Sequence, residues 1–154
     1  MPSSVTTQIH NCFPCLDYLY IQECDEVNGL QWPISFQLPQ CLYGLSSLTR
    51  LVLISTKIKN FPTEVMATLH ALDGLDLQEC NELSSVEGLH CLPSLKRLSI
   101  RQCPKFHSLP EGGFPSSLET LEIIECDLGL MERCQQEQSL EWLMIQHIPN
   151  QRYF

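Results

Sequence analysis

Few residues of this chain have the types and the spacing that chemistry requires. Cys12 and Cys15 form a C-x-x-C pair, which is the spacing of redox dithiols and of half a zinc site. No second C-x-x-C and no H-x-x-x-H completes a zinc site, and no βαβ pattern follows that would indicate a thioredoxin-like fold. We therefore interpret this pair as a structural coincidence.

The other reactive residue types are scattered along the chain. The five histidines lack metal-ligand spacing, the serines have no G-x-S-x-G context, and no G-x-x-x-x-G-K-[ST] loop provides a phosphate cradle. The acid pair Glu122 and Glu125 falls on an expected open strand rather than in a pocket suited to acid–base catalysis. We expect no enzymatic activity, no cofactor and no metal.

The element that positions most of these residues is a short strand followed by a turn. Leu95, Leu98, Ile100 and Cys103 occupy the first, fourth, sixth and ninth places of the pattern L-x-x-L-x-L-x-x-N/C, which is typical of one leucine-rich repeat. Leu98 and Ile100 are two residues apart, so they share one face of a strand. The residues between them face the opposite way, toward solvent or a partner.

The same pattern recurs along the chain. From the second copy onward, successive starts are 22 to 24 residues apart, which is within the range of 20–29 typical of this repeat. The first gap is longer and contains an insertion at residues 25–44, which we interpret either as an enlarged outer arc or as a degenerate repeat. The copies begin at Leu16, Leu48, Leu72, Leu95, Leu118 and Leu140.

These repeats predict an α/β leucine-rich-repeat solenoid, a horseshoe with a parallel concave sheet of short strands and a mostly irregular or 3-10 convex side. The expected domain spans residues 13–154 with about six repeats, and residues 1–12 form an unpatterned tail. Residues 64–72 have the spacing of one or two helical turns. Because neither end carries a polar capping repeat, we expect a piece of a longer chain or a truncated relative of one.

Composition restricts the class of partner. The chain has 154 residues, of which 44% are hydrophobic and 18% are charged, an ordinary globular balance. Its formal net charge of −9 argues against non-specific binding to nucleic acid or to anionic membranes. No run is apolar enough to cross a membrane, and residues 1–11 show no secretory signal. We expect a cytoplasmic protein whose partner is another protein.

The cysteines fit this location. Four of the nine, Cys24, Cys80, Cys103 and Cys126, fall at the ninth place of their repeats. A cysteine that recurs at the same place of each repeat is expected to fill space in the core, because free cysteine behaves as a small hydrophobic residue. We predict reduced, buried thiols rather than a disulfide framework.

A partner would bind the outward strand positions on the concave face. Aromatic side chains, Met and Arg are enriched at the cores of protein interfaces, and several occur here although repeat packing does not require them. The alternative is that they are ordinary exposed residues and that Trp142 only covers an open end. The candidate partner-binding residues are Tyr18, Tyr20, Val52, Ile54, Arg97, Arg101, Glu122, Ile124, Trp142 and Met144.

Charge is banded across three consecutive repeats. The third and fifth repeats carry acidic residues on and beside their strands, and the fourth carries basic ones. Neighbouring bands of opposite sign would pair across the strands, either as a solvated ladder or as a code that a partner reads. The three bands are Asp73, Asp76 and Glu79; Lys96, Arg97 and Arg101; and Glu119, Glu122 and Glu125.

Two phrases carry a resemblance to a known family. Residues 92–104 read LPSLKRLSIRQCP, and residues 108–123 read SLPEGGFPSSLETLEI. They resemble the C-terminal leucine-rich repeats of plant NB-LRR disease-resistance proteins of the coiled-coil class, over about residues 13–148. The resemblance implies a sensor that recognises a pathogen effector or a guarded host protein. It also implies autoinhibitory packing on the nucleotide-binding domain of the same receptor. The alternative is the substrate-binding part of an F-box ubiquitin-ligase adaptor.

Overall fold

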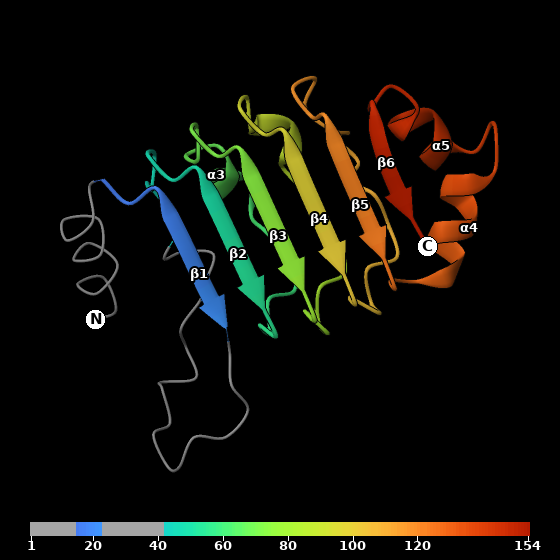
Figure 1. Ribbon diagram of the computed structural model, residues 1–154, viewed down its shortest axis with the longest axis horizontal. Helices are drawn as coiled ribbons and strands as arrows, with labels where there is room; N and C mark the ends of the chain where they lie inside the picture. The colour runs from blue at the N-terminus through green and yellow to red at the C-terminus, as the bar shows by residue number, and fades with distance from the viewer. Residues whose placement is uncertain (1–14, 23–41) are drawn as a thin grey trace, which may run out of the picture.

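Six short strands form one parallel sheet in the computed structural model, which describes residues 15–22 and 42–154. The strands lie side by side in chain order, and each pairs in parallel with the next (Figure 1). This confirms the expected α/β class with a parallel sheet, an arrangement compatible with a solenoid. The strands are β1 (Tyr18–Gln22), β2 (Arg50–Ile54), β3 (Gly74–Gln78), β4 (Arg97–Arg101), β5 (Thr120–Ile124) and β6 (Asn150–Tyr153).

Alternation along each strand creates the core. In β4, Leu98 and Ile100 are buried, whereas Arg97 and Arg101 are exposed. Because the strands pair without a shift, the fourth-place side chains of successive strands face each other, as do the sixth-place ones. The first row is Leu19, Leu51, Leu75, Leu98 and Leu121, and the second is Ile21, Leu53, Leu77, Ile100 and Ile123.

From β2 to β5, turns, one short helix and one 3-10 turn return the chain from each strand to the next. Helix α3 (Thr63–Met66) is one helical turn, where one or two turns were expected over residues 64–72, and it lies behind the sheet in Figure 1. The 3-10 turn η1 (Leu89–Cys91) occurs in the following return. Phe106 and Leu109 are buried, as the pattern of the fourth repeat predicts.

The ninth places are buried in every described repeat that has one. Thr56, Cys80, Cys103 and Cys126 occupy them, and the three cysteines are free thiols. The Cys126 thiol lies 3.6 Å from the carbonyl oxygen of Ile100 in the preceding repeat, to which it donates. Hydrogen bonds with Cys126 and Cys80, together with burial, raise the pKa of Cys103. The predicted buried, reduced thiols are confirmed for these three residues.

The predicted sixth repeat is wrong in its placement. Residues 140–145 do not form a strand, because they belong to helix α5 (Leu140–Ile145), and the sixth strand lies further on, at Asn150–Tyr153. The Ser139 hydroxyl caps α5 by accepting a hydrogen bond from the Trp142 backbone N–H at 3.0 Å. The cap at Ser139 favours a helix at these residues, although their leucines have the spacing of a repeat strand.

A second helix precedes α5 and explains the longer last interval. Helix α4 (Leu128–Gln135) is capped by Asp127, whose carboxylate accepts from the Leu130 N–H at 2.9 Å. Arg133 of α4 donates to Glu141 of α5 at 2.6 Å, which joins the two helices. Both lie beside β6 at the C-terminal end of the sheet (Figure 1). Ile148, buried two residues before β6, takes the first place of this repeat.

Some predictions lie outside the described residues. These are the tail at residues 1–12, most of the insertion at 25–44, and the ninth-place Cys24; of the C-x-x-C pair only Cys15 is described, and it is exposed. Within the described part of the chain, no helix has the length and apolar character needed to cross a membrane.

Candidate protein-binding surface

One face of the sheet is not covered by a helix of the described residues (Figure 1). We call it the open face, and we define it by the third, fifth and seventh places of the strands. It consists of Tyr18, Tyr20, Gln22, Arg50, Val52, Ile54, Gly74, Asp76, Gln78, Arg97, Ser99, Arg101, Thr120, Glu122, Ile124, Asn150 and Arg152.

The structure brings most of the predicted partner-binding residues together on the open face. Tyr18 and Tyr20 of β1 are 49% and 47% exposed. Val52 and Ile54 of β2 and Ile124 of β5 are half-buried beside polar neighbours. Arg97, Arg101 and Glu122 lie between them on β4 and β5. The face therefore presents apolar side chains at both sides of a charged centre.

Trp142 and Met144 are the exceptions, and their placement on the concave strands was wrong. Both lie on α5, because the capped helix replaces the expected strand. Each is half-buried, and Met144 packs against the core cluster. They are separate from the open face and take no part in the surface described here.

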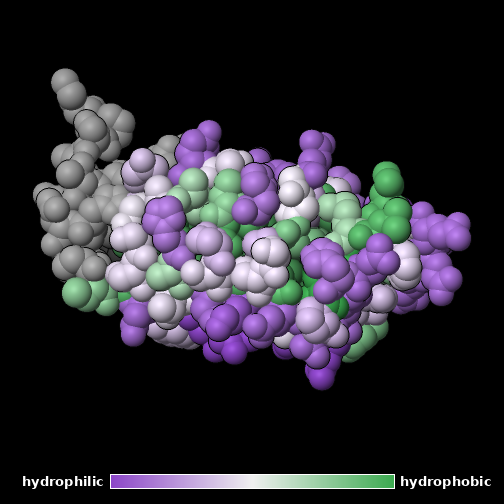
Figure 2. Space-filling model, turned by 90° about the horizontal axis from the view of Figure 1, so that it is seen from above, coloured by the Kyte–Doolittle hydropathy of each residue, from purple (hydrophilic) through white to green (hydrophobic). Residues whose placement is uncertain are grey.

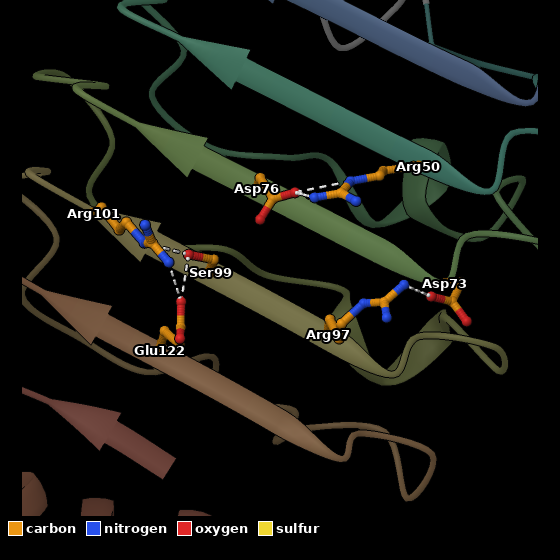
Figure 3. A network of polar contacts seen from close by, with 7 residues as sticks. All are labelled: Arg50, Asp73, Asp76, Arg97, Ser99, Arg101 and Glu122. Carbon is orange, nitrogen blue, oxygen red and sulfur yellow. Dashed lines mark hydrogen bonds and ion pairs between the residues drawn. The ribbon is translucent and has the colours of Figure 1, made fainter. Parts of the chain in front are cut away.

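Ion pairs across the strands order the charged centre. The Arg50 guanidinium donates to Asp76 on the next strand at 2.9 and 3.2 Å. Arg97 donates to Asp73 at 2.7 Å, and Arg101 donates to Glu122 (Figure 3). The predicted pairing between neighbouring charge bands is confirmed for Arg97 with Asp73 and for Arg101 with Glu122, whereas Asp76 pairs with Arg50, which lies outside the predicted bands. Glu79 and Glu125 differ, since they accept from Ser55 and Gln102 instead.

Glu122 is the most enclosed carboxylate of this network. Its side chain is 15% exposed, and Arg152 of β6 lies 3.6 Å from it on the side away from Arg101. The hydrogen bond from Arg101 holds the pKa of this carboxyl below its ordinary value, with Ser99 and Arg152 adding to the effect. Glu122 therefore stays charged near neutral pH and keeps Arg101 in place.

Sequence reasoning missed the residues that β6 contributes. Asn150 and Arg152 extend the open face, and they line a shallow hollow of about 430 Å³ with Thr120 and Glu122. The sixth strand was not predicted, because its inward places hold Gln151 and Tyr153, where the neighbouring strand β5 has Leu121 and Ile123. The helix-capping residues Asp127 and Ser139 were the signal that the repeat is interrupted.

Hydrophobic side chains are also exposed away from the sheet. Leu128 at the start of α4 and Leu140 and Leu143 of α5 are largely exposed. Figure 2 shows a hydrophobic cluster near the C-terminal end of a surface that is otherwise mostly hydrophilic at its rims. Leu128, Leu140 and Leu143 belong to α4 and α5 and not to the open face.

Over residues 15–22 and 42–154, no group of three His, Cys, Asp or Glu side chains has the geometry to hold a metal ion. Comparisons with protein-family models, with curated proteins and with solved structures gave no match to this chain.

Proposed function

We propose that this chain is a non-enzymatic protein-recognition module built as a leucine-rich-repeat solenoid, and that its open face binds a protein partner. One observation carries the proposal. The strands pair in register on rows of leucine and isoleucine, and the opposite side of the sheet carries tyrosine, aliphatic and arginine side chains over which no helix or strand of the described residues lies. Repeat packing uses only the inward rows, so the outward residue types are available for recognition.

We further propose that the module is the sensor and autoinhibitory region of a plant intracellular immune receptor, and that it acts in the cytoplasm. The support is the resemblance carried by residues 92–104 and 108–123, together with buried free thiols at the ninth places. In this reading the partner is a pathogen effector, a guarded host protein or the nucleotide-binding domain of the same receptor. The chain itself needs no cofactor.

The coding region upstream of residue 1 tests the receptor assignment. We expect it to encode a nucleotide-binding domain with a G-x-x-x-x-G-K-[ST] loop. A region encoding an F-box helical bundle would overturn the assignment in favour of the ubiquitin-ligase adaptor.

Binding to that upstream domain tests the open face itself. We expect Tyr20→Ala combined with Ile54→Ala to weaken binding about tenfold or more, because truncating interface anchors typically costs more than 1 kcal/mol each. The control is Leu128→Ala, which removes a similar exposed apolar side chain from the helical end. If the control weakens binding and the double variant does not, the helical end is the binding surface and the open face is not.

A further inference from the structure

A shallow hollow lies on the open face over β2, β3 and β4. Its middle is the row of fifth-place side chains, which the strand register places side by side. The side chains of this row, Val52, Asp76 and Ser99, are shorter than the tyrosine and arginine side chains around them. We call this depression of about 300 Å³ the fifth-place hollow, and we define it by Tyr18, Arg50, Val52, Asp76, Ser99 and Arg101.

The Arg50 side chain lies down over β3 at one side of the hollow. Its Cγ lies 3.6 Å from the point where a Cβ of Gly74 would stand, so its stem covers this buried glycine. Its Nε and Nη2 donate to Oδ2 of Asp76 at 3.2 and 2.9 Å, which fixes the guanidinium plane (Figure 3). Because the side chain is 51% exposed, a partner can reach this plane. A fixed, flat guanidinium is a surface on which an aromatic ring can stack.

Ion pairs balance the charge in the fifth-place hollow. Arg50 donates to Asp76, and Arg101 donates to Glu122, so each guanidinium already has a carboxylate partner. A further carboxylate would compete with these two carboxylates, and a further cation would meet two arginines. The hollow therefore favours a partner side chain that carries no net charge.

One oxygen of Asp76 has no donor among the described residues. Both bonds from Arg50 end on Oδ2, and no donor of residues 15–22 or 42–154 reaches Oδ1. Figure 3 shows this second oxygen pointing away from Arg50. The Asp76 side chain is 32% exposed, so a partner that covered it would take this oxygen out of water. Burial of an unpaired carboxylate oxygen is costly, and the covering residue must therefore bring an N–H or O–H donor.

Apolar surface completes the hollow. Tyr18 of β1 is 49% exposed, and Val52 of β2 is half-buried. An asparagine or glutamine of the partner would bring a donor but leave this surface uncovered, whereas phenylalanine or leucine would cover it without a donor. Tyrosine and tryptophan do both, because each joins a broad apolar ring to one polar donor.

We propose that the fifth-place hollow binds a tyrosine or tryptophan side chain of the protein partner. The ring stacks on the Arg50 guanidinium, and its O–H or N–H donates to Oδ1 of Asp76. Tyr18 and Val52 contact the rest of the ring. The inference rests on the proposed function, because it names the partner residue that the open face selects.

Selection of a random heptapeptide library on the immobilised chain tests the hollow. We expect the wild type to enrich tyrosine or tryptophan, and Arg50→Gln combined with Asp76→Leu to lose that enrichment. The matched control is Lys105→Gln with Glu82→Leu, which removes an ion pair of similar exposure outside the open face and should keep the enrichment. Melting temperatures check that both double variants fold.

Synthetic peptides from the selection separate the ring from its donor. Changing the selected tyrosine to phenylalanine should weaken binding to the wild type about tenfold and to Asp76→Leu less than about twofold. For a selected tryptophan, methylation of the indole nitrogen makes the same comparison. An equal loss in both proteins, or no loss in the wild type, would overturn the hydrogen bond to Asp76.

Arg50→Gln tests the stacking separately. It should weaken binding of the phenylalanine peptide about threefold, because the ring loses its cation, and an unchanged affinity would contradict the stacking. Peptides enriched for other residues would overturn the hollow and leave the proposed function standing. Aromatic enrichment that survives Arg50→Gln with Asp76→Leu, or that the control loses equally, would have the same meaning. No enrichment on the wild type would contradict both proposals.

Discussion

At the scale of one residue, Leu98 tests whether the inward rows hold the strands together. It is 1% exposed and pairs in register with Leu75 and Leu121. We expect Leu98→Asp to lower the free energy of unfolding by about 4 kcal/mol or more, because it removes buried apolar area and buries an unpaired charge. Chemical denaturation or thermal melting measures the change. An unaltered melting temperature would refute the register.

The control for Leu98→Asp is Leu128→Asp. Leu128 is 72% exposed and is the first residue of α4, where an acidic side chain suits the positive end of the helix dipole. The same chemical change should therefore cost little at this position. Equal losses at both positions would mean that Asp destabilises the chain for reasons other than burial.

Glu122 predicts a pH dependence at the same scale. Its folded-state pKa is lowered by Arg101, so the stability that it contributes is present above its ordinary pKa of 4.5 and is lost as the pH falls through the folded value. We expect Glu122→Gln to be less stable than the wild type by about 1 kcal/mol at pH 7. The difference should shrink as the pH is lowered from 7 toward 3, because the carboxyl becomes protonated and resembles the amide as the pH falls through its folded pKa.

Urea denaturation of the wild type and of Glu122→Gln at both pH values measures this difference. Glu119→Gln removes the same charge from an exposed residue nearby and corrects for the change in net charge. A gap between wild type and Glu122→Gln that stays the same from pH 7 to pH 3 would mean that the carboxylate charge has no part in the stability of this network.

At the scale of the element, α5 depends on its cap. The Ser139 hydroxyl accepts from the Trp142 N–H and donates to the carbonyl of Arg133, so it satisfies one backbone group of each helix. We expect Ser139→Ala to cost about 1 kcal/mol of unfolding free energy. Ser116→Ala, a change at an exposed turn serine, is the comparison. Equal, negligible costs would show that the cap does not hold α5.

The strands differ in whether they can be predicted from the sequence. The strands β1–β5 follow from the leucine spacing because the inward places of a strand must be apolar, and Leu75, Leu98 and Leu121 satisfy that rule without exception. The sixth strand does not follow, because Gln151 and Tyr153 fill its inward places. At the end of the sheet the burial requirement relaxes, whereas the leucines of α5 repeat the expected spacing by coincidence.

The candidate site was predictable to the same degree. The outward residues of β1–β5 follow directly from the strand register, so Tyr18, Tyr20, Val52 and Arg97 were placed correctly. The pairing of Arg97 with Asp73 and of Arg101 with Glu122 followed from the charge bands, whereas that of Asp76 with Arg50 did not, because Arg50 lies outside the bands.

At the scale of the whole molecule, each of the six described strands pairs with its neighbours in chain order and with no other described strand. Stability in such a stack is a sum of unit and interface terms, so the ends open more easily than the middle. Strands β3, β4 and β5 have a paired strand on each side and fully apolar inward places. Within residues 15–22 and 42–154, strand β1 pairs with β2 alone, and its inward residues Leu19 and Ile21 are only half-buried.

Hydrogen–deuterium exchange of the intact chain distinguishes these strands. We expect amides of β3 and β4 to exchange at least about a hundredfold more slowly than those of β1, since each lost interface lowers the local opening free energy by a few kcal/mol. Leu98→Asp should erase this gradient around β4 while leaving α4 and α5 protected. Uniform protection from β1 to β6 would mean that the sheet opens as one cooperative unit, and the additive description of the stack would then fail.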